Sequence, residues 1–154
     1  MKKKRILFFV VAVCFCCSGV FGIEVGVLGG KMSNPSQTTY GFSAGMGLLV
    51  PLVKLEVEYC RIKKVELMEL PNVITAGVKL RPKLGNFSPY AIIGVGADFY
   101  KFNLRLSEYD KFTFIGGGVH YFFTGMVSIR ADIRFFNYSG FNRTRFTGGI
   151  FIHI

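Results

Sequence analysis

The sequence predicts an all-β fold, an eight-stranded antiparallel up-and-down transmembrane β-barrel. Its composition is apolar, with 51% hydrophobic residues, 17 Phe and 19 Gly among 154 residues. After residue 22, however, no apolar run reaches the roughly 20 residues that a membrane-spanning helix needs. Polar and apolar residues alternate instead, as in GMVSIRADIRFF at residues 125–136. Such alternation is typical of a strand with one apolar and one charged face.

A secretory signal peptide is predicted at residues 1–22. Residues 2–5 are basic, residues 6–17 form an apolar run, and small residues precede a cleavage site after Gly22. The apolar run is too short to span a bilayer, which disfavours a retained N-terminal anchor. Cleavage would leave residues 23–154 as one barrel domain.

The mature chain is expected to be basic and to lack disulfides. Loss of four basic residues lowers the formal charge from +10 to about +6, and Cys60 is the one cysteine left. A lone cysteine forms no internal disulfide, and no His, Asp or Glu cluster has the spacing of metal ligands. We therefore expect no metal and no cofactor. An exported chain has little access to nucleic acid, so anionic lipid or polysaccharide is the expected partner of the basic charge.

Eight segments alternate over about the 9–11 residues of a tilted transmembrane strand. They run, in order, from Ile23 to Lys31, Thr39 to Val50, Leu52 to Arg61, Asn72 to Arg81, Ser88 to Phe102, Lys111 to Phe123, Gly125 to Tyr138 and Arg143 to Ile154. Pro51, the pair at 124–125 and the slightly longer RPKLGNFSP supply turns. The other connections are longer polar loops, namely KMSNPSQT, IKKVELMELP, NLRLSEYD and NYSGFN. Short turns at one end and long loops at the other, with both termini at the short end, predict an even-stranded barrel.

Charged residues fall on one face of each strand. In the third strand, Lys54, Glu56 and Glu58 oppose Leu55, Val57 and Tyr59; in the fourth, Thr75, Gly77, Lys79 and Arg81 oppose Ile74, Ala76, Val78 and Leu80. In the fifth, Gly94, Gly96 and Asp98 oppose Ile93, Val95, Ala97 and Phe99. In the seventh, Ser128, Arg130, Asp132 and Arg134 oppose Val127, Ile129, Ala131, Ile133 and Phe135; in the eighth, Arg145, Thr147 and His153 oppose Phe146, Ile150, Ile152 and Ile154.

The charged face is predicted to be the inside of the barrel. It is poor in the Lys, Glu and Asn that coat a soluble surface and rich in small residues, with glycines that leave room for large neighbours: Gly94, Gly96, Gly116 and Gly118. Buried charges are costly unless they pair, and both signs are present on neighbouring strands. The predicted interior polar network consists of Glu56, Glu58, Lys79, Arg81, Asp98, Arg130, Asp132 and Arg134. The inverse arrangement, with the apolar face inward, would make a periplasmic lipocalin-like carrier.

Aromatic residues gather near the predicted strand ends, as in the interfacial girdles of membrane barrels. They are Tyr40, Phe42, Tyr59, Phe99, Tyr100, Tyr121, Phe123, Phe135 and Tyr138. Their clustering favours a wall that faces lipid.

Two glycine-rich stretches carry the most specific motifs. In FSPYAIIGVGADFY, residues 87–100, a Pro-Tyr pair precedes alternating glycines, and GGGVHYFFTGMVSIRADIRFF, residues 116–136, joins a Gly-rich strand through a tight turn to a strand with the pair Arg130 and Asp132. These motifs resemble the small OmpA-like eight-stranded outer membrane β-barrel protein family, by motif in the second half of the chain and by pattern in the first. The resemblance implies a bacterial outer membrane location and insertion by the barrel assembly machinery. The family usually ends in an aromatic residue, whereas this chain ends in Ile154.

We expect a structural or surface-interaction role rather than catalysis or transport. Eight strands enclose a space that side chains normally fill, so paired charges would close the interior and long loops would face outside. A narrow pore for small solutes is the alternative, because interior glycines could leave a file of water between charged rings.

A basic cluster in the second long loop, Arg61, Lys63 and Lys64, is the candidate contact with anionic lipopolysaccharide or a host surface. The expected partners are thus membrane lipid and lipopolysaccharide, with no nucleic acid, and a monomer is expected.

A lipid-modifying barrel enzyme is the third hypothesis. Nucleophilic catalysis needs a nucleophile beside an oriented base, and Ser128, His120 and His153 lie on the polar face, where Glu56 or Glu58 could orient a base. The His-x-Ser pair of lipid A deacylases is absent, however, because Tyr121 and Phe122 follow His120. We therefore expect no enzymatic activity.

Overall fold

The computed structural model describes residues 22–33, 36–48, 52–63, 71–99 and 110–154. Alternating residues pair edge to edge over these ranges and form eight strands. The strands are β1 (Ile23–Met32), β2 (Gln37–Gly47), β3 (Val53–Ile62), β4 (Asn72–Leu80), β5 (Phe87–Phe99), β6 (Asp110–Phe122), β7 (Val127–Tyr138) and β8 (Asn142–His153). No helix in this part of the chain is long and apolar enough to cross a membrane. The predicted signal peptide lies almost entirely outside the described residues, as do Pro51, Lys64 and Tyr100.

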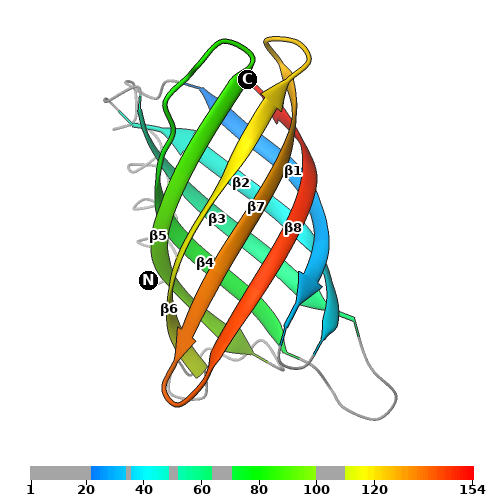
Figure 1. Cartoon of the computed structure of the whole chain (residues 1–154), viewed down its shortest axis with the longest axis vertical. Helices are drawn as coiled ribbons and strands as arrows, with labels where there is room; N and C mark the ends of the chain where they lie inside the picture. The colour runs from blue at the N-terminus through cyan, green and yellow to red at the C-terminus, as the bar shows by residue number, and fades with distance from the viewer. Residues whose placement is uncertain (1–21, 34–35, 49–51, 64–70, 100–109) are drawn as a thin grey trace, which may run out of the picture.

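The strands close into a single barrel. Each pairs antiparallel with the next in sequence, and β1 pairs with β8 to complete the ring. Figure 1 shows the tilted strands wrapped around one axis. The predicted all-β, eight-stranded antiparallel up-and-down barrel is confirmed.

The two ends of the barrel differ. The β4–β5 and β6–β7 connections lie at the end that also carries Ile154, at the top of Figure 1, which we call the turn end. There the amide of Ile23 donates to the carbonyl of Ile154 at 2.8 Å. The opposite end, the loop end, carries the β3–β4 and β7–β8 connections.

The prediction of four long loops at the loop end was wrong for two of them. Residues 33–36 suffice to connect β1 to β2, and residues 139–141 connect β7 to β8. Gly140 adopts a φ of 122°, a conformation that glycine reaches without a steric penalty, so a tight turn forms where a polar loop was expected.

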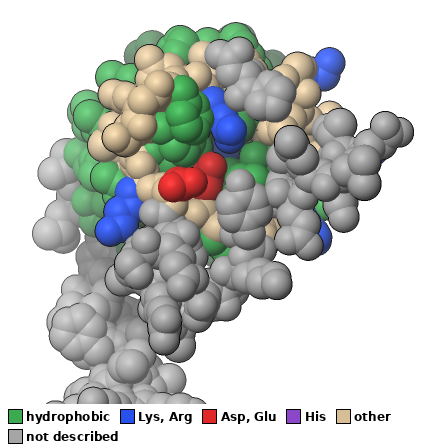
Figure 2. All heavy atoms as spheres, turned by 90° about the horizontal axis from the view of Figure 1, so that it is seen from below, with side chains coloured by type: hydrophobic (Ala, Val, Ile, Leu, Met, Phe, Trp, Pro, Cys, Tyr) green, Lys and Arg blue, Asp and Glu red, His purple; other side chains and the backbone are tan. Residues whose placement is uncertain are grey.

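The polar face of each strand is the inside of the barrel. In β7, for example, Arg134 is fully buried whereas its neighbour Phe135 is 50% exposed. Figure 2 shows the loop end, where charged side chains gather at the mouth and hydrophobic side chains surround them. The lipocalin-like alternative, with apolar side chains inward, is therefore wrong.

Inward-facing glycines lie against large side chains. A Cβ atom at Gly96 would lie 2.4 Å from the ring of Phe112, and one at Gly118 would lie 2.7 Å from Cβ of Asp132. Real Cβ contacts are never so short, so each glycine provides the space that a neighbouring side chain occupies. The interior is consequently packed.

The interior also holds aromatic residues that the sequence pattern did not assign to it. Phe112, Phe114, Phe136 and Phe151 are all buried there. Tyr138, which was predicted to belong to the outer girdle, is only 5% exposed and shares the inward parity of Phe136 in β7. On the outer wall, the exposed members of the predicted girdle include Tyr40, Phe42, Phe123 and Phe135.

Candidate functional site

A layer of opposed charges crosses the middle of the barrel. Three arginines from β7 and β8 face three carboxylates from β3 and β7; this middle layer consists of Arg130, Arg134, Arg145, Glu56, Glu58 and Asp132. Nη2 of Arg134 lies 2.5 Å from Oε1 of Glu56 and 3.0 Å from Oε2 of Glu58. Arg130 reaches the same two glutamates at 2.8 and 3.0 Å. Because β3 and β7 lie across the barrel from each other, these bonds span the lumen.

Hydrogen bonds and aromatic rings enclose the middle layer. The hydroxyl of Tyr90 donates to Asp132 at 2.7 Å, and Thr147 donates to the other carboxylate oxygen. The guanidinium of Arg130 lies 4.3 Å from the ring centroid of Phe151, a cation–π distance. Each arginine of the layer stacks on its own ring, with Arg134 over Phe114 and Arg145 over Phe136. The middle layer thus combines three positive with three negative groups, and all six are buried from solvent.

A second group of charges lies nearer the turn end. Glu24 of β1 accepts hydrogen bonds from Lys54 at 3.1 Å, Lys79 at 2.6 Å and Arg81 at 2.5 Å. Lys79 also lies 2.5 Å from Glu56 and so connects this group to the middle layer. We call Glu24, Lys54, Lys79 and Arg81 the turn-end layer.

Seven of the eight predicted network residues are joined through these contacts. They are Glu56, Glu58, Lys79, Arg81, Arg130, Asp132 and Arg134. Asp98 lies apart, near the loop end of β5, where Tyr138 donates to it at 3.0 Å and Arg143 approaches to 3.8 Å. Glu24 was missed by the sequence prediction, although it is the single acid of the first predicted strand. Lys54 and Arg145 were placed on the correct face but not in the network.

A serine and two histidines form a small polar cluster beside the turn-end layer. Oγ of Ser128 lies 3.0 Å from Nδ1 of His120 and 2.7 Å from Nε2 of His153. Nδ1 of His153 lies 3.6 Å from Glu24, so the order serine, histidine, carboxylate matches that of a catalytic triad. Both Ser128 and His120 are fully buried, however, and Glu24 is already held by its cations. The Ser128 hydroxyl is therefore closed to solvent, and its two imidazole neighbours hold it in place.

The outer wall carries charge near the loop end. The charged residues at outward positions of the described strands are Lys31, Arg61 and Lys111, each one residue from the loop end of its strand. Lys63 follows β3 and is also exposed, whereas Lys64 of the predicted cluster lies outside the described residues. We call Lys31, Arg61, Lys63 and Lys111 the loop-end belt.

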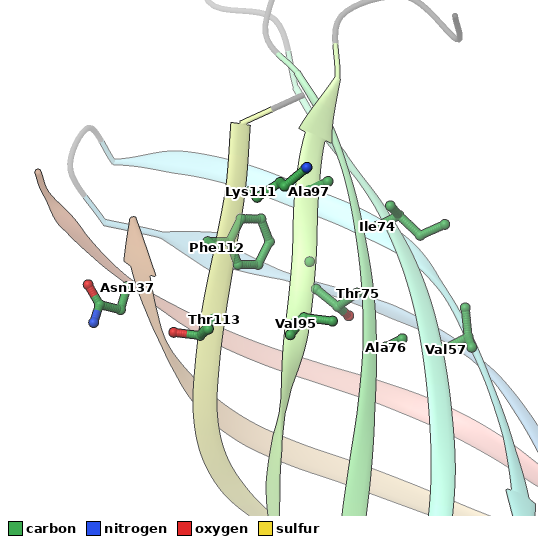
Figure 3. Close-up of a pocket in the computed structure, with 11 residues that line it drawn as sticks. Val57, Ile74, Thr75, Ala76, Val95, Ala97, Lys111, Phe112, Thr113 and Asn137 are labelled. Atoms are coloured by element: carbon green, nitrogen blue, oxygen red, sulfur yellow. The ribbon is translucent and has the colours of Figure 1, made fainter. Parts of the chain in front are cut away.

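An apolar groove of about 560 Å³ lies on the outer wall, on the turn-end side of this belt (Figure 3). Ala76, Val95 and Ala97 are among the outward side chains that line it, with Ile74 and Val57 on one side and Thr113 and Asn137 on the other. Lys111 lies at the end nearest the loops, with its amine directed over Ala97. The groove combines an apolar floor with a cation at one end, which suits an acyl chain and an anionic headgroup. Among the described residues, no group of three or more His, Cys, Asp or Glu side chains is placed to hold a metal ion.

The fold is similar to those of solved outer membrane barrels. The N-terminal β-barrel domain of Pseudomonas aeruginosa OprF matches with a TM-score of 0.72 at 17% sequence identity, over 86% of this chain and 97% of that one. Neisserial surface protein A, NspA, matches with a TM-score of 0.62 at 16% identity, over 88% and 97%. Ail, the attachment invasion locus protein of Yersinia pestis, matches with a TM-score of 0.57 at 11% identity, over 86% and 97%. No protein-family model matches the sequence, and no curated protein matches it significantly.

These similarities establish the fold and leave the activity open. The predicted resemblance to OmpA-like outer membrane barrels is confirmed at the level of the fold. The outer membrane enzyme PagL also matches, with a TM-score of 0.50 at 14% identity over 85% of this chain and 98% of that one. Ail has also been solved in complex with the heparin analogue sucrose octasulfate. Because enzymes and non-enzymes share this barrel, function has to be argued from the residues.

Proposed function

We propose that this protein is a monomeric, non-conducting outer membrane barrel with a structural and surface-interaction role. The observation that carries the proposal is the middle layer, in which arginines and carboxylates join opposite walls of the lumen without exposure to solvent. A water file would have to pass through these contacts, and breaking them is costly in a low-dielectric interior. The fold of the solved neighbours supports the location. Export by the signal peptide at residues 1–22 and insertion by the barrel assembly machinery belong to the same proposal.

The loop end is the part of the barrel that we propose binds lipopolysaccharide. In the proposed orientation the loop end faces the cell exterior, and the loop-end belt lies at the level of the phosphates of lipopolysaccharide. Each cation near an anionic membrane surface contributes about 1 kcal/mol to attraction. The outer groove beneath Lys111 would accept an acyl chain of the same glycolipid. The complex of Ail with a polyanionic sugar supports an anionic glycan partner for a barrel of this shape.

Membrane fractionation and conductance test the main proposal. The protein expressed in a Gram-negative host should appear in the outer membrane fraction, and its gel migration should change on boiling, because a closed barrel resists the detergent until it is heated. In planar bilayers it should give no conductance steps above background. Regular steps would instead establish the narrow pore, and a soluble periplasmic band without a heat shift would contradict the membrane location.

Glycolipid binding tests the surface role separately. The variant combining Arg61→Gln, Lys63→Gln and Lys111→Gln should lose binding to lipopolysaccharide vesicles by tenfold or more, with a weaker dependence on salt. Leu84→Gln, an exposed position in the β4–β5 connection at the turn end, is the control and should bind like the unaltered protein. Equal binding by both variants would remove the loop-end belt as the contact. Lipid A from the expressing cells should show an unchanged mass spectrum, since no catalysis is proposed.

A further inference from the structure

The turn-end layer carries more positive than negative charge. Lys54, Lys79 and Arg81 all point to one carboxylate, that of Glu24. The second contact of Lys79, with Glu56, does not remove the excess, because Glu56 already faces two arginines of the middle layer. The middle layer is balanced, so the two layers together carry two surplus positive charges, and both belong to the turn-end layer. Uncompensated charge inside a barrel is costly, which makes an anionic partner at this end favourable.

A cavity opens where this excess lies. It has a volume of about 250 Å³ and is lined by Lys54, Arg81, Lys83, Ser88 and His153, among others. The side chains of Lys54 and Arg81 are 11% and 9% exposed, so neither is sealed from solvent as Lys79 is. Lys83 is exposed at the rim, and no acid among the described residues lies within ion-pair distance of it. Three cations therefore line one small cavity, and within the part of the chain that the structure describes Glu24 is the only carboxylate paired with Lys54 or Arg81.

We propose that this cavity binds a phosphate group. A phosphate monoester or inorganic phosphate carries a charge of about −1.5 to −2 at neutral pH, which matches the surplus of the turn-end layer. The guanidinium of Arg81 and the amines of Lys54 and Lys83 supply charge-assisted donors, and arginine can bond two phosphate oxygens at once. Ser88 and His153 also line the cavity and bring a hydroxyl group and an imidazole ring to it. A carboxylate would neutralise only half of the excess, so phosphate is favoured over it.

The phosphate can come from two sources with the same chemistry. One is a free phosphate or small phosphomonoester in the aqueous compartment at the turn end. The other is the headgroup of a phosphomonoester lipid in the adjacent leaflet. The cavity shares no residue with the loop-end belt, so the two proposals can be tested independently.

Titration of the full-length barrel in zwitterionic detergent tests the site. Calorimetry with inorganic phosphate should show saturable binding to one site per chain, with acetate binding at least tenfold more weakly. Lys83→Gln and Lys54→Gln should each weaken phosphate binding at least tenfold. Lys111→Gln, which removes a cation at the other end of the barrel, should not change it. A heat-dependent gel shift verifies that each variant is folded, and Lys83 is exposed and bound to no other described charge, so its loss should not disturb the fold.

The two sources are separated by a second titration. Short-chain phosphatidic acid is added to the same samples below its micelle concentration. Binding of phosphate supports the free anion, whereas binding of phosphatidic acid alone supports the lipid headgroup. If neither ligand saturates, or if Lys83→Gln and Lys54→Gln bind as tightly as the unaltered protein, the proposal is overturned.

Discussion

The middle layer and the turn-end layer are built from the same residue types and differ in balance and closure. In the middle layer three arginines share three carboxylates, and all six residues are almost fully buried. In the turn-end layer three cations share Glu24 beside an open cavity. Charges that neutralise each other can be buried out of contact with water. Cations in excess of their carboxylates are stabilised by contact with solvent or with a bound anion. The comparison separates charges that hold the barrel together from charges that are available for binding.

The largest expected effect comes from breaking the balance of the middle layer. Arg134→Met removes one cation shared by Glu56, Glu58 and Asp132, and leaves two arginines for the three buried carboxylates of the middle layer. Removal of one member of a buried ion pair typically costs about 3–5 kcal/mol. Urea unfolding of the barrel in lipid vesicles should show a loss of this size. Ile133→Met, an outward substitution next to it in β7, is the control and should change the free energy of unfolding little. Equal stability of the two variants would mean that the middle layer does not hold the walls together.

A smaller effect is expected from filling the space that the packed interior needs. In Gly96→Ala the new Cβ atom would lie 2.4 Å from the ring of Phe112 and 2.7 Å from the carbonyl oxygen of Ile74. Overpacking of this kind costs about 1–3 kcal/mol. Gly148→Ala is the matched control, because the nearest atom to its Cβ would be 3.7 Å away. Urea unfolding should therefore separate the two alanine variants, and a stable Gly96→Ala barrel would show that the interior is looser than its geometry implies.

The smallest effect should come from the turn-end layer. Lys54→Met removes one of three cations from Glu24 and leaves Lys79 and Arg81 bound to it. Because the remaining charges are closer to balance, the free energy of unfolding should change by less than about 1 kcal/mol, well below the usual cost of breaking a buried pair. The same urea titration provides the measurement. A loss as large as that of Arg134→Met would abolish the distinction between the two layers.

Alternation along the chain was enough to predict the strands and their inward faces, but not the partners within the interior. Strand period depends on neighbouring residues, so Glu56, Glu58 and Arg134 could be assigned to one face from the local pattern. Arg134 and Glu56, however, are 78 residues apart in sequence, and their contact depends on the register of every pairing between β3 and β7. Nothing local to β1 marks Glu24 as the residue on which three cations converge.

Residue type misled the prediction where position mattered more. Tyr138 was assigned to the girdle because tyrosine is common at membrane interfaces, yet its parity in β7 directs it inward to Asp98. The residues around Gly140 were assigned to a long loop because they are polar. The backbone freedom of that glycine allows a tight turn instead.

The pairing of β1 with β8 sets an order of events for the biogenesis of the protein. The seam joins the first strand of the barrel to the last, and the guanidinium groups that neutralise Glu56 and Glu58 arrive only with β7 and β8. A nascent sheet that stops at β6 would leave Glu58 without a cation, Glu56 with Lys79 alone, and an unpaired strand edge in the bilayer. Such a species is poorly soluble in lipid and prone to aggregation. We therefore expect closure of the seam to accompany entry into the bilayer, because the last strands to be synthesised complete both the ring of backbone hydrogen bonds and the balance of its interior charges.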